Sequence, residues 1–183
     1  LLVIVAVAVL LSGLSFFFGS SKQEKSNGGR FLIATLGAAI WSIAIMVFIK
    51  MPNTSETFAH AIVTCIIAGV TLCDVGLLAY LGWQHKGGKI ATIIFATVGA
   101  ILVALLAYDS SLFYTSIDVS QEYAHLFINK GWYYYTVIAF FFLISMVFSS
   151  YLQKQIKKTT NKGLKRGLQI FYAGLSIGGI LAL

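Results

Sequence analysis

The chain has 183 residues, of which 58% are hydrophobic and only 10% are charged, and its mean hydropathy is +0.88. A soluble domain carries roughly 25% charged residues, so this composition excludes a protein whose whole surface faces water and indicates one that lipid covers. The net charge of +7 does not indicate nucleic acid as a partner, because the basic residues lie in short segments between apolar runs, which is typical of membrane proteins.

Six apolar runs follow one another along the chain. A helix that spans a bilayer needs about 20 apolar residues, within a range of about 17 to 25, and the first five runs meet this length. The runs are continuous rather than alternating, and helices satisfy their own backbone in lipid, so strands are disfavoured. We therefore predict an all-α bundle that forms one transmembrane domain over residues 1–183. The runs are Leu1–Gly19, Phe31–Ile49, Phe58–Trp83, Ile90–Tyr108, Trp132–Leu152 and Leu168–Leu183.

Both ends of the chain, Leu1 and Leu183, lie inside apolar runs. We therefore expect a fragment of a longer polypeptide. About six transmembrane helices are visible, or six of seven if a further helix follows.

The basic residues are divided unevenly among the loops. The loops after the second and fourth runs hold only Lys50 and Lys130, whereas every other Lys and Arg lies within residues 20–30, 84–89 or 153–167. Lys and Arg accumulate on the cytoplasmic side of a membrane protein. We therefore predict a multi-pass protein of the cell membrane, with these three loops in the cytoplasm and the N-terminus outside.

Local signals mark several helix ends. Gly28-Gly29 is expected to help close the loop before the second run. Before the third run, Ser55 offers a hydroxyl cap and Glu56 places a carboxylate in the first turn. Gly87-Gly88 separates the third and fourth runs, which predicts a tight hairpin of two helices.

Trp41 lies in the middle of the second run. Tryptophan prefers the membrane interface, and at mid-depth its indole N–H needs a partner. We expect Trp41 to point into the bundle near Ser42, either as core packing or as the wall of a ligand pocket.

Asp74 is the one charged residue well inside a run. A carboxylate at membrane depth costs a few kcal/mol, so it usually faces the bundle or a wet cavity. Two interpretations stay open. Asp74 is either a ligand contact or proton-sensitive switch, or a neutral group that ties helices together, for example through Thr71.

His60 lies near the outer end of the third run. It is either a wet interfacial histidine or part of an extracellular mouth with Trp132, Tyr133 and His125. No cofactor is expected.

Several patterns that would indicate chemistry have simpler interpretations. Cys65 and Cys73 are eight positions apart on one run, so they point roughly 80° apart and lie about 12 Å apart along the axis, which excludes a disulfide. The histidines and cysteines do not predict a metal site. Gly174 and Gly178 predict close helix packing, and no catalytic constellation surrounds Ser176, so we predict no enzymatic activity in this chain.

The segment 109–130 is the only long loop. Its second half, Asp118–Asn129, places Tyr123 and Phe127 on one face of a helix. We expect a short surface helix that covers the outer opening of the bundle as a lid. The aromatic cluster Trp132–Tyr135 follows directly and is typical of a membrane interface.

Three stretches carry a resemblance to a known family. They are Arg30 with the following Ala38–Ser42, then Gly131–Tyr134, and then Lys165–Ile170 with the small-residue run to Leu183. Together they resemble the N-terminal seven-helix membrane region of bacterial sensor histidine kinases and related signalling proteins. This resemblance implies an external N-terminus, seven helices and a cytoplasmic output domain.

Two functions from different classes are therefore expected. The first is a sensory input module that detects an external or membrane stimulus and relays it to a cytoplasmic output domain. The alternative is a small-solute transporter, or a membrane-embedded subunit or scaffold of a larger complex. The expected partners are the lipid bilayer and a small-molecule or physical stimulus, with a homodimer or another membrane protein left open. The candidate ligand-binding residues are Asp74, Trp41, His60, Tyr123, Trp132 and Tyr134.

Overall fold

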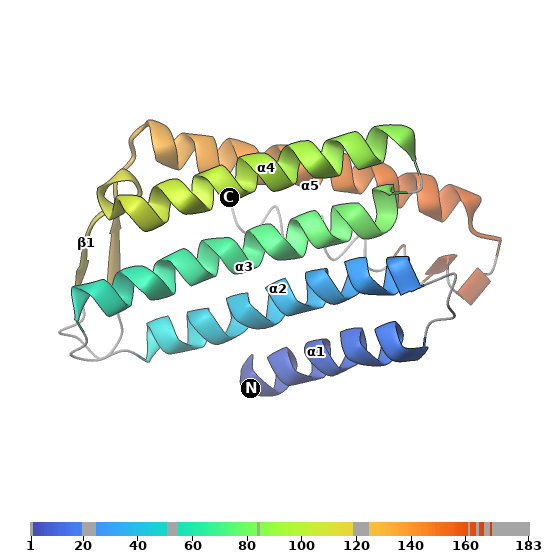
Figure 1. Ribbon diagram of the computed structural model, residues 1–183, viewed down its shortest axis with the longest axis horizontal. Coiled ribbons are helices and arrows are strands. Elements are labelled where there is room, and N and C mark those ends of the chain that lie inside the picture. Colours follow the sequence, from blue (N-terminus) through green and yellow to red (C-terminus); the bar gives the residue numbers. More distant parts are fainter. Residues whose placement is uncertain are drawn as a thin grey trace.

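A computed structural model describes residues 2–19, 25–50, 55–83, 85–118 and 125–160, together with residues 162, 163, 165, 166 and 169. Within this part of the chain, five helices lie side by side along one long axis (Figure 1). Each helix runs back along the one before it (Figure 1). The helices are α1 (Leu2–Gly19), α2 (Lys25–Ile49), α3 (Glu56–Gly82), α4 (Lys86–Tyr108) and α5 (Trp132–Lys158).

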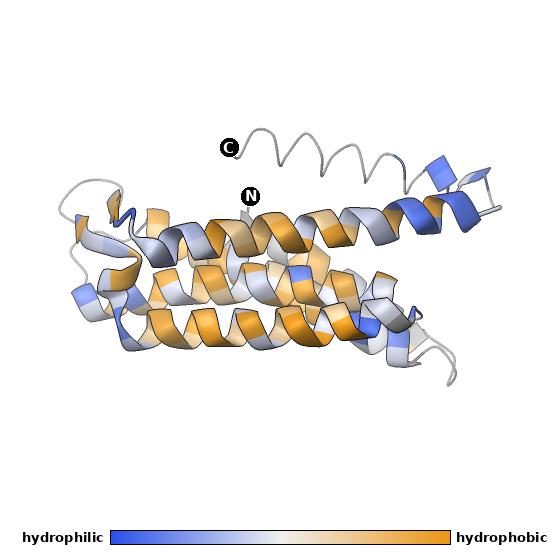
Figure 2. Ribbon diagram, turned by 90° about the horizontal axis from the view of Figure 1, so that it is seen from above, coloured by the Kyte–Doolittle hydropathy of each residue, from blue (hydrophilic) through white to orange (hydrophobic). Residues whose placement is uncertain are grey.

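Four of these helices are long and apolar enough to cross a membrane, and Figure 2 shows their apolar bodies with hydrophilic residues toward the ends. This confirms the prediction of a mainly helical bundle whose long apolar helices could span a membrane. The count of six spans stays a prediction, because α1 does not appear among the four and the sixth run, apart from Gln169, lies outside the described residues. The four candidate spans are Ser26–Ile49, Glu56–Gly82, Gly87–Tyr108 and Trp132–Lys158.

The helices extend past the apolar runs on their polar sides. Helix α2 already begins at Lys25, so Gly28-Gly29 lies inside a helix, and the prediction that it closes a loop was wrong. The Arg30 guanidinium donates to the Asn27 side-chain oxygen at 2.6 Å and to the Ser26 hydroxyl at 2.7 Å. These contacts at i−3 and i−4 support the first turns of α2. Likewise α5 continues to Lys158, so residues 153–158 are helical rather than loop.

The third helix begins as predicted. Ser55 is its N-cap, and the Ser55 hydroxyl accepts a hydrogen bond from the Phe58 backbone N–H at 3.3 Å. Glu56 lies in the first turn. Helix α3 ends at Gly82 and α4 begins at Lys86, which confirms the tight connection between them. Gly87-Gly88 lies inside α4, so the prediction that it separates the two helices was wrong.

Helices α2 and α3 approach backbone to backbone. A Cβ atom added to Gly69 would lie 2.6 Å from the Trp41 backbone nitrogen, and one added to Gly76 would lie 2.5 Å from the Ala34 nitrogen. Gly37 faces the Cys73 backbone in the same way. Small residues permit such close approach in membranes, where packing rather than the hydrophobic effect holds helices together.

The central helix is α3, which packs against α2, α4 and α5. The interior between α3, α4 and α5 holds the fully buried side chains of Leu78, Leu106, Tyr133 and Ile144. Helix α1 packs along α2.

The loop between α4 and α5 forms a β-hairpin, so the predicted surface helix over Asp118–Asn129 was wrong. After the short helix η1 (Ser110–Leu112), strand β1 (Tyr114–Asp118) pairs with the antiparallel strand β2 (His125–Ile128). Helical spacing within 118–129 suggested a helix, but the pairing partner lies earlier in the chain, where aromatic and β-branched residues favour a strand.

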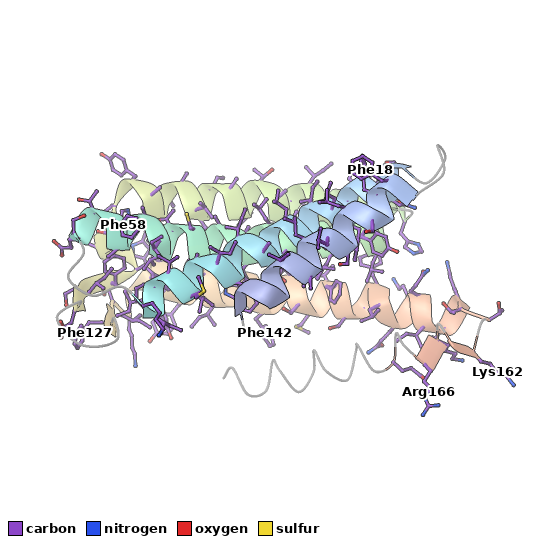
Figure 3. All side chains as sticks on the ribbon, turned by 90° about the horizontal axis from the view of Figure 1, so that it is seen from below. Phe18, Phe58, Phe127, Phe142, Lys162 and Arg166 are labelled. Carbon is purple, nitrogen blue, oxygen red and sulfur yellow. The ribbon has the colours of Figure 1, made fainter. Side chains whose placement is uncertain are left out.

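The hairpin covers one end of the bundle through different residues from those expected. Tyr114 is buried, and Ile117 and Leu126 pack against the core. Phe127 is 54% exposed, and Tyr123 lies outside the described residues. We call this end, with η1, β1 and β2, the hairpin end, and the opposite end, with Trp83, the basic end. Figure 3 shows Phe58 and Phe127 at the first, and Lys162 and Arg166 at the second.

Candidate functional site

A polar contact joins α3 to the hairpin. The Nδ1 atom of His60, in the second turn of α3, lies 2.8 Å from the hydroxyl of Tyr114 on β1. The Nε2 atom of the same ring lies 3.4 Å from the backbone oxygen of Ala107 near the end of α4. That oxygen can only accept, so Nε2 carries the hydrogen and Nδ1 accepts from the Tyr114 hydroxyl. One imidazole therefore connects three elements.

Tyr114 is only 4% exposed, although it belongs to a surface hairpin. Burial raises the pKa of its hydroxyl above the ordinary value, and the charge of Glu56 raises it further. A hydrogen bond with the Ser110 side chain lowers the pKa, but this effect is smaller than that of burial. Tyr114 therefore keeps its proton and remains the donor to His60.

Aromatic rings gather where the hairpin end meets α5. The Tyr133 hydroxyl is buried and donates to the Leu102 backbone oxygen in α4 at 2.5 Å. The Phe113 ring contacts Tyr133 edge-on, with centroids 6.2 Å apart, and Tyr134 at 6.1 Å. Trp132 is 62% exposed and meets Tyr133 edge-on at 5.8 Å. Tyr133 is thus a structural anchor, whereas Trp132 and Tyr134 lie around it.

Backbone contacts close the hairpin end. Asp109 caps η1, because its Oδ1 atom accepts from the Ser111 backbone N–H at 2.9 Å and from the Ser111 hydroxyl at 2.7 Å. The Asn129 side-chain amide donates to the Ser111 oxygen at 2.6 Å. The Asn129 N–H donates to the Phe113 oxygen at 2.8 Å. These bonds hold the base of the hairpin against the start of α5.

The structure brings together only some of the predicted ligand-binding residues. His60, Trp132 and Tyr134 all lie at the hairpin end. Asp74 is 14 positions after His60 on α3, which places it about 21 Å further along the helix. The side chain of His125, expected beside His60, is outside the described part of the structure.

The Asp74 side chain is only partly exposed, in the middle of a candidate span. Thr71 does not pair with it, because the Thr71 hydroxyl donates to the Ile67 backbone oxygen at 2.8 Å. The proposed tie through Thr71 was therefore wrong. Hydroxyls in helices commonly bond to their own preceding turn. Among the described residues, Asp74 has no hydrogen-bond partner. No hydrogen bond within this part of the chain therefore replaces the hydration that its carboxyl loses in an apolar segment.

Trp41 does not point into the bundle, contrary to expectation. Its side chain is 40% exposed, and the Ser42 hydroxyl donates to the Ala38 oxygen at 2.8 Å instead of reaching the indole. The reason lies on the neighbouring helix. The Trp41 backbone is pressed against Gly69 of α3, which leaves no room for an indole between the two helices.

Tyr114 is the residue of this site that the sequence did not reveal. It begins the stretch Tyr114–Asp118, which contains an aromatic residue and two β-branched ones. That composition is a signal for a strand, but the contact with His60 depends on the distant pairing of β1 with β2. Within the described residues, no three His, Cys, Asp or Glu side chains come together as metal ligands.

Comparison of this chain with protein families, with curated proteins and with solved structures found no match.

Proposed function

We propose that this chain is the membrane-embedded input module of a signalling protein, in which a stimulus at the hairpin end is relayed along α3 to the basic end. One observation carries the proposal. Helix α3 is a continuous helix of 27 residues, with the contact of His60 to the hairpin near its start and Trp83 as its C-cap. A displacement of its first turns therefore reaches the opposite side of the bundle without a break.

The His60–Tyr114 contact is the element that a stimulus would change. A small polar molecule that competes for the imidazole or for the hydroxyl separates the hairpin from α3. The close packing of Gly69 and Gly76 against α2 makes the two helices move together, and small shifts of packed helices are a common form of signal transmission.

The orientation of the module follows from its charges. Arg30, Lys89, Lys154 and the basic residues after α5 belong to the basic end, which the positive-inside rule places in the cytoplasm. The hairpin end then faces outward, where an external stimulus reaches it. The resemblance of three stretches to the sensor region of bacterial histidine kinases supports the same assignment by analogy.

Distance measurements between spin labels test the relay in the full chain reconstituted into lipid bilayers. Cys65 and Cys73 are replaced by alanine, and labels are attached at Ile33→Cys on α2 and Gln155→Cys on α5, both of which are exposed positions. We expect Tyr114→Phe and His60→Ala to shift the distance distribution. Tyr108→Phe is the matched control, because Tyr108 lies at the same end and is 91% exposed. An unchanged distribution in all three variants would contradict a relay.

A second candidate function is transport of protons or small cations, and one observation favours it. Asp74 places a carboxyl without a hydrogen-bond partner among the described residues inside a candidate span. Intramembrane carboxyls frequently belong to ion or proton pathways. Ion flux into liposomes that contain the protein separates the two functions, since an input module relays a displacement without net transport.

A further inference from the structure

Two cations from different helices approach one indole ring at the basic end. The Arg30 guanidinium carbon lies 4.4 Å from the centre of a Trp83 ring, and the Lys89 ammonium nitrogen lies 5.7 Å from it. Arg30 belongs to the second turn of α2, Trp83 is the C-cap of α3, and Lys89 is in the first turn of α4. Three helices thus contribute to a single cluster, which we call the Arg30–Trp83–Lys89 site.

No carboxylate of the described chain neutralises these cations. The described acidic residues are Glu56 in the first turn of α3, Asp74 in its middle, and Asp109 and Asp118 at the hairpin end. The hydrogen bonds of Arg30 to Asn27 and Ser26 go to neutral acceptors. The indole ring attracts each cation through its π face, but it brings the two positive charges together without cancelling them.

Helix ends of both signs lie at the basic end. Helix α2 begins at Lys25 and α4 begins at Lys86, so the amino-terminal ends of both helices lie at the basic end. Such ends carry partial positive charge and favour anions. The carboxyl-terminal end of α3 at Trp83 carries the opposite partial charge, so the two cations, rather than the helix ends, favour a single anionic group beside Trp83.

The surroundings of the site favour a lipid as the source of that anion. Trp83 directly follows the candidate span Glu56–Gly82, and tryptophan is typical of the depth of the headgroups. One turn after Lys89, on the same face of α4, Ile93 is 59% exposed. A phosphate held by Arg30 and Lys89 would therefore continue into an acyl chain that lies along Ile93.

We infer that Arg30, Trp83 and Lys89 bind the phosphate of an anionic phospholipid, with the acyl chain beside α4. The inference does not depend on the proposed relay, because any membrane protein with this geometry would present the same site. It does require that the basic end lies at the membrane surface.

Quenching of Trp83 fluorescence by brominated lipids tests the site in the full chain. Trp41→Phe and Trp132→Phe leave Trp83 as the one indole. In mixed micelles, brominated phosphatidylglycerol should quench Trp83 at about tenfold lower mole fraction than brominated phosphatidylcholine. Both lipids carry a phosphate, but the choline cation of phosphatidylcholine is repelled by Arg30 and Lys89. Equal quenching by the two lipids would overturn the inference.

Matched substitutions locate the binding. Arg30→Gln and Lys89→Gln should each reduce the preference for phosphatidylglycerol several-fold, whereas Lys154→Gln should leave it unchanged. Lys154 is a suitable control because its Nζ also lies over an aromatic ring, 5.0 Å from the centre of Tyr151. An equal loss in Lys154→Gln would show a general effect of charge and overturn the site. Thermal unfolding of each variant, with Arg30→Lys as a charge-preserving form, separates lost binding from lost folding.

A soluble headgroup distinguishes a lipid from a free phosphate. Glycerol phosphate, which has the anionic group without acyl chains, should not relieve the quenching when it is added in excess. Relief would mean that the phosphate alone is recognised, and the inferred role of the acyl chain would be wrong.

Discussion

The imidazole of His60 and the hydroxyl of Tyr114 lie 2.8 Å apart, although 54 residues separate them in the sequence. A two-stranded hairpin is at best marginally stable alone in water. The hairpin formed by β1 and β2 therefore depends on its attachment to the bundle. This contact and the burial of the Tyr114 ring contribute to that attachment, together with the packing of Ile117 and Leu126.

The first prediction concerns the strength of this attachment. Tyr114→Phe and His60→Ala each remove the hydrogen bond, and a bond of this kind contributes about 0.5–1.5 kcal/mol. Amide hydrogen exchange of strands β1 and β2 should accelerate by roughly two- to tenfold in each variant. The double variant should exchange no faster than the faster single variant, because both changes break the same bond. Fully additive effects would mean that the two side chains do not interact.

Alkaline pH should weaken the same attachment. Burial raises the folded-state pKa of Tyr114 above its unfolded value, which is about 10. The stabilisation is therefore complete below the unfolded pKa and is lost as the pH rises through the folded pKa, because the unfolded chain releases this proton first. Thermal unfolding of the detergent-solubilised protein, followed by intrinsic tryptophan fluorescence, should show a steeper alkaline decline in the wild type than in Tyr114→Phe. The same decline in both proteins would contradict this assignment.

The spans could be predicted from sequence because they depend on local composition. The predicted run Ile90–Tyr108 lies within the observed α4, and Ser55 caps α3 as its hydroxyl and position suggested. The polar ends of two helices were missed. Hydropathy alone starts the second helix after Lys25 and stops the fifth before Lys158, but both residues are helical. Helix propensity, not burial, determines the backbone conformation of such polar residues.

The candidate site could be predicted only in part, because its contacts are not local. His60 was identified as a candidate, but its partner Tyr114 follows from the pairing of two strands that helical periodicity does not detect. The direction of Trp41 depends on Gly69, a residue of another helix. The spacing of residues along one segment reveals neither the contact of His60 with Tyr114 nor that of Trp41 with Gly69.

Labelling of introduced cysteines tests the orientation of the bundle. In a background without Cys65 and Cys73, Thr160→Cys at the basic end should react with an impermeant thiol reagent only after cells are permeabilised. Ser116→Cys on β1 is exposed and should react in intact cells. The positive-inside rule is the physical reason. The reverse labelling pattern would place the hairpin in the cytoplasm and contradict the orientation.

Asp74→Asn tests the role of the carboxyl inside α3. Asparagine has nearly the same shape and carries no charge, and an ionised carboxyl in a span costs a few kcal/mol. We therefore expect the thermal stability of the variant to equal or exceed that of the wild type. Any proton or cation flux measured in liposomes should disappear in the variant. If flux persists in Asp74→Asn, the carboxyl is not part of the transport pathway and its role is in packing.

The last prediction concerns the glycines between α2 and α3. In Gly69→Ala the new methyl group would lie 2.6 Å from the Trp41 backbone nitrogen, and this backbone cannot move aside as a flexible side chain can. Overpacking of this kind typically costs about 1–3 kcal/mol, so the unfolding free energy in detergent should fall by that amount. Gly29→Ala is the control, because its nearest neighbour, the Phe17 ring, would be 3.9 Å away. Alanine has the higher helix propensity by about 1 kcal/mol, so the control should be neutral or slightly more stable. If Gly69→Ala were as stable as Gly29→Ala, the two helices could not be in backbone contact, and their movement as one body in the proposed relay would lose its structural basis.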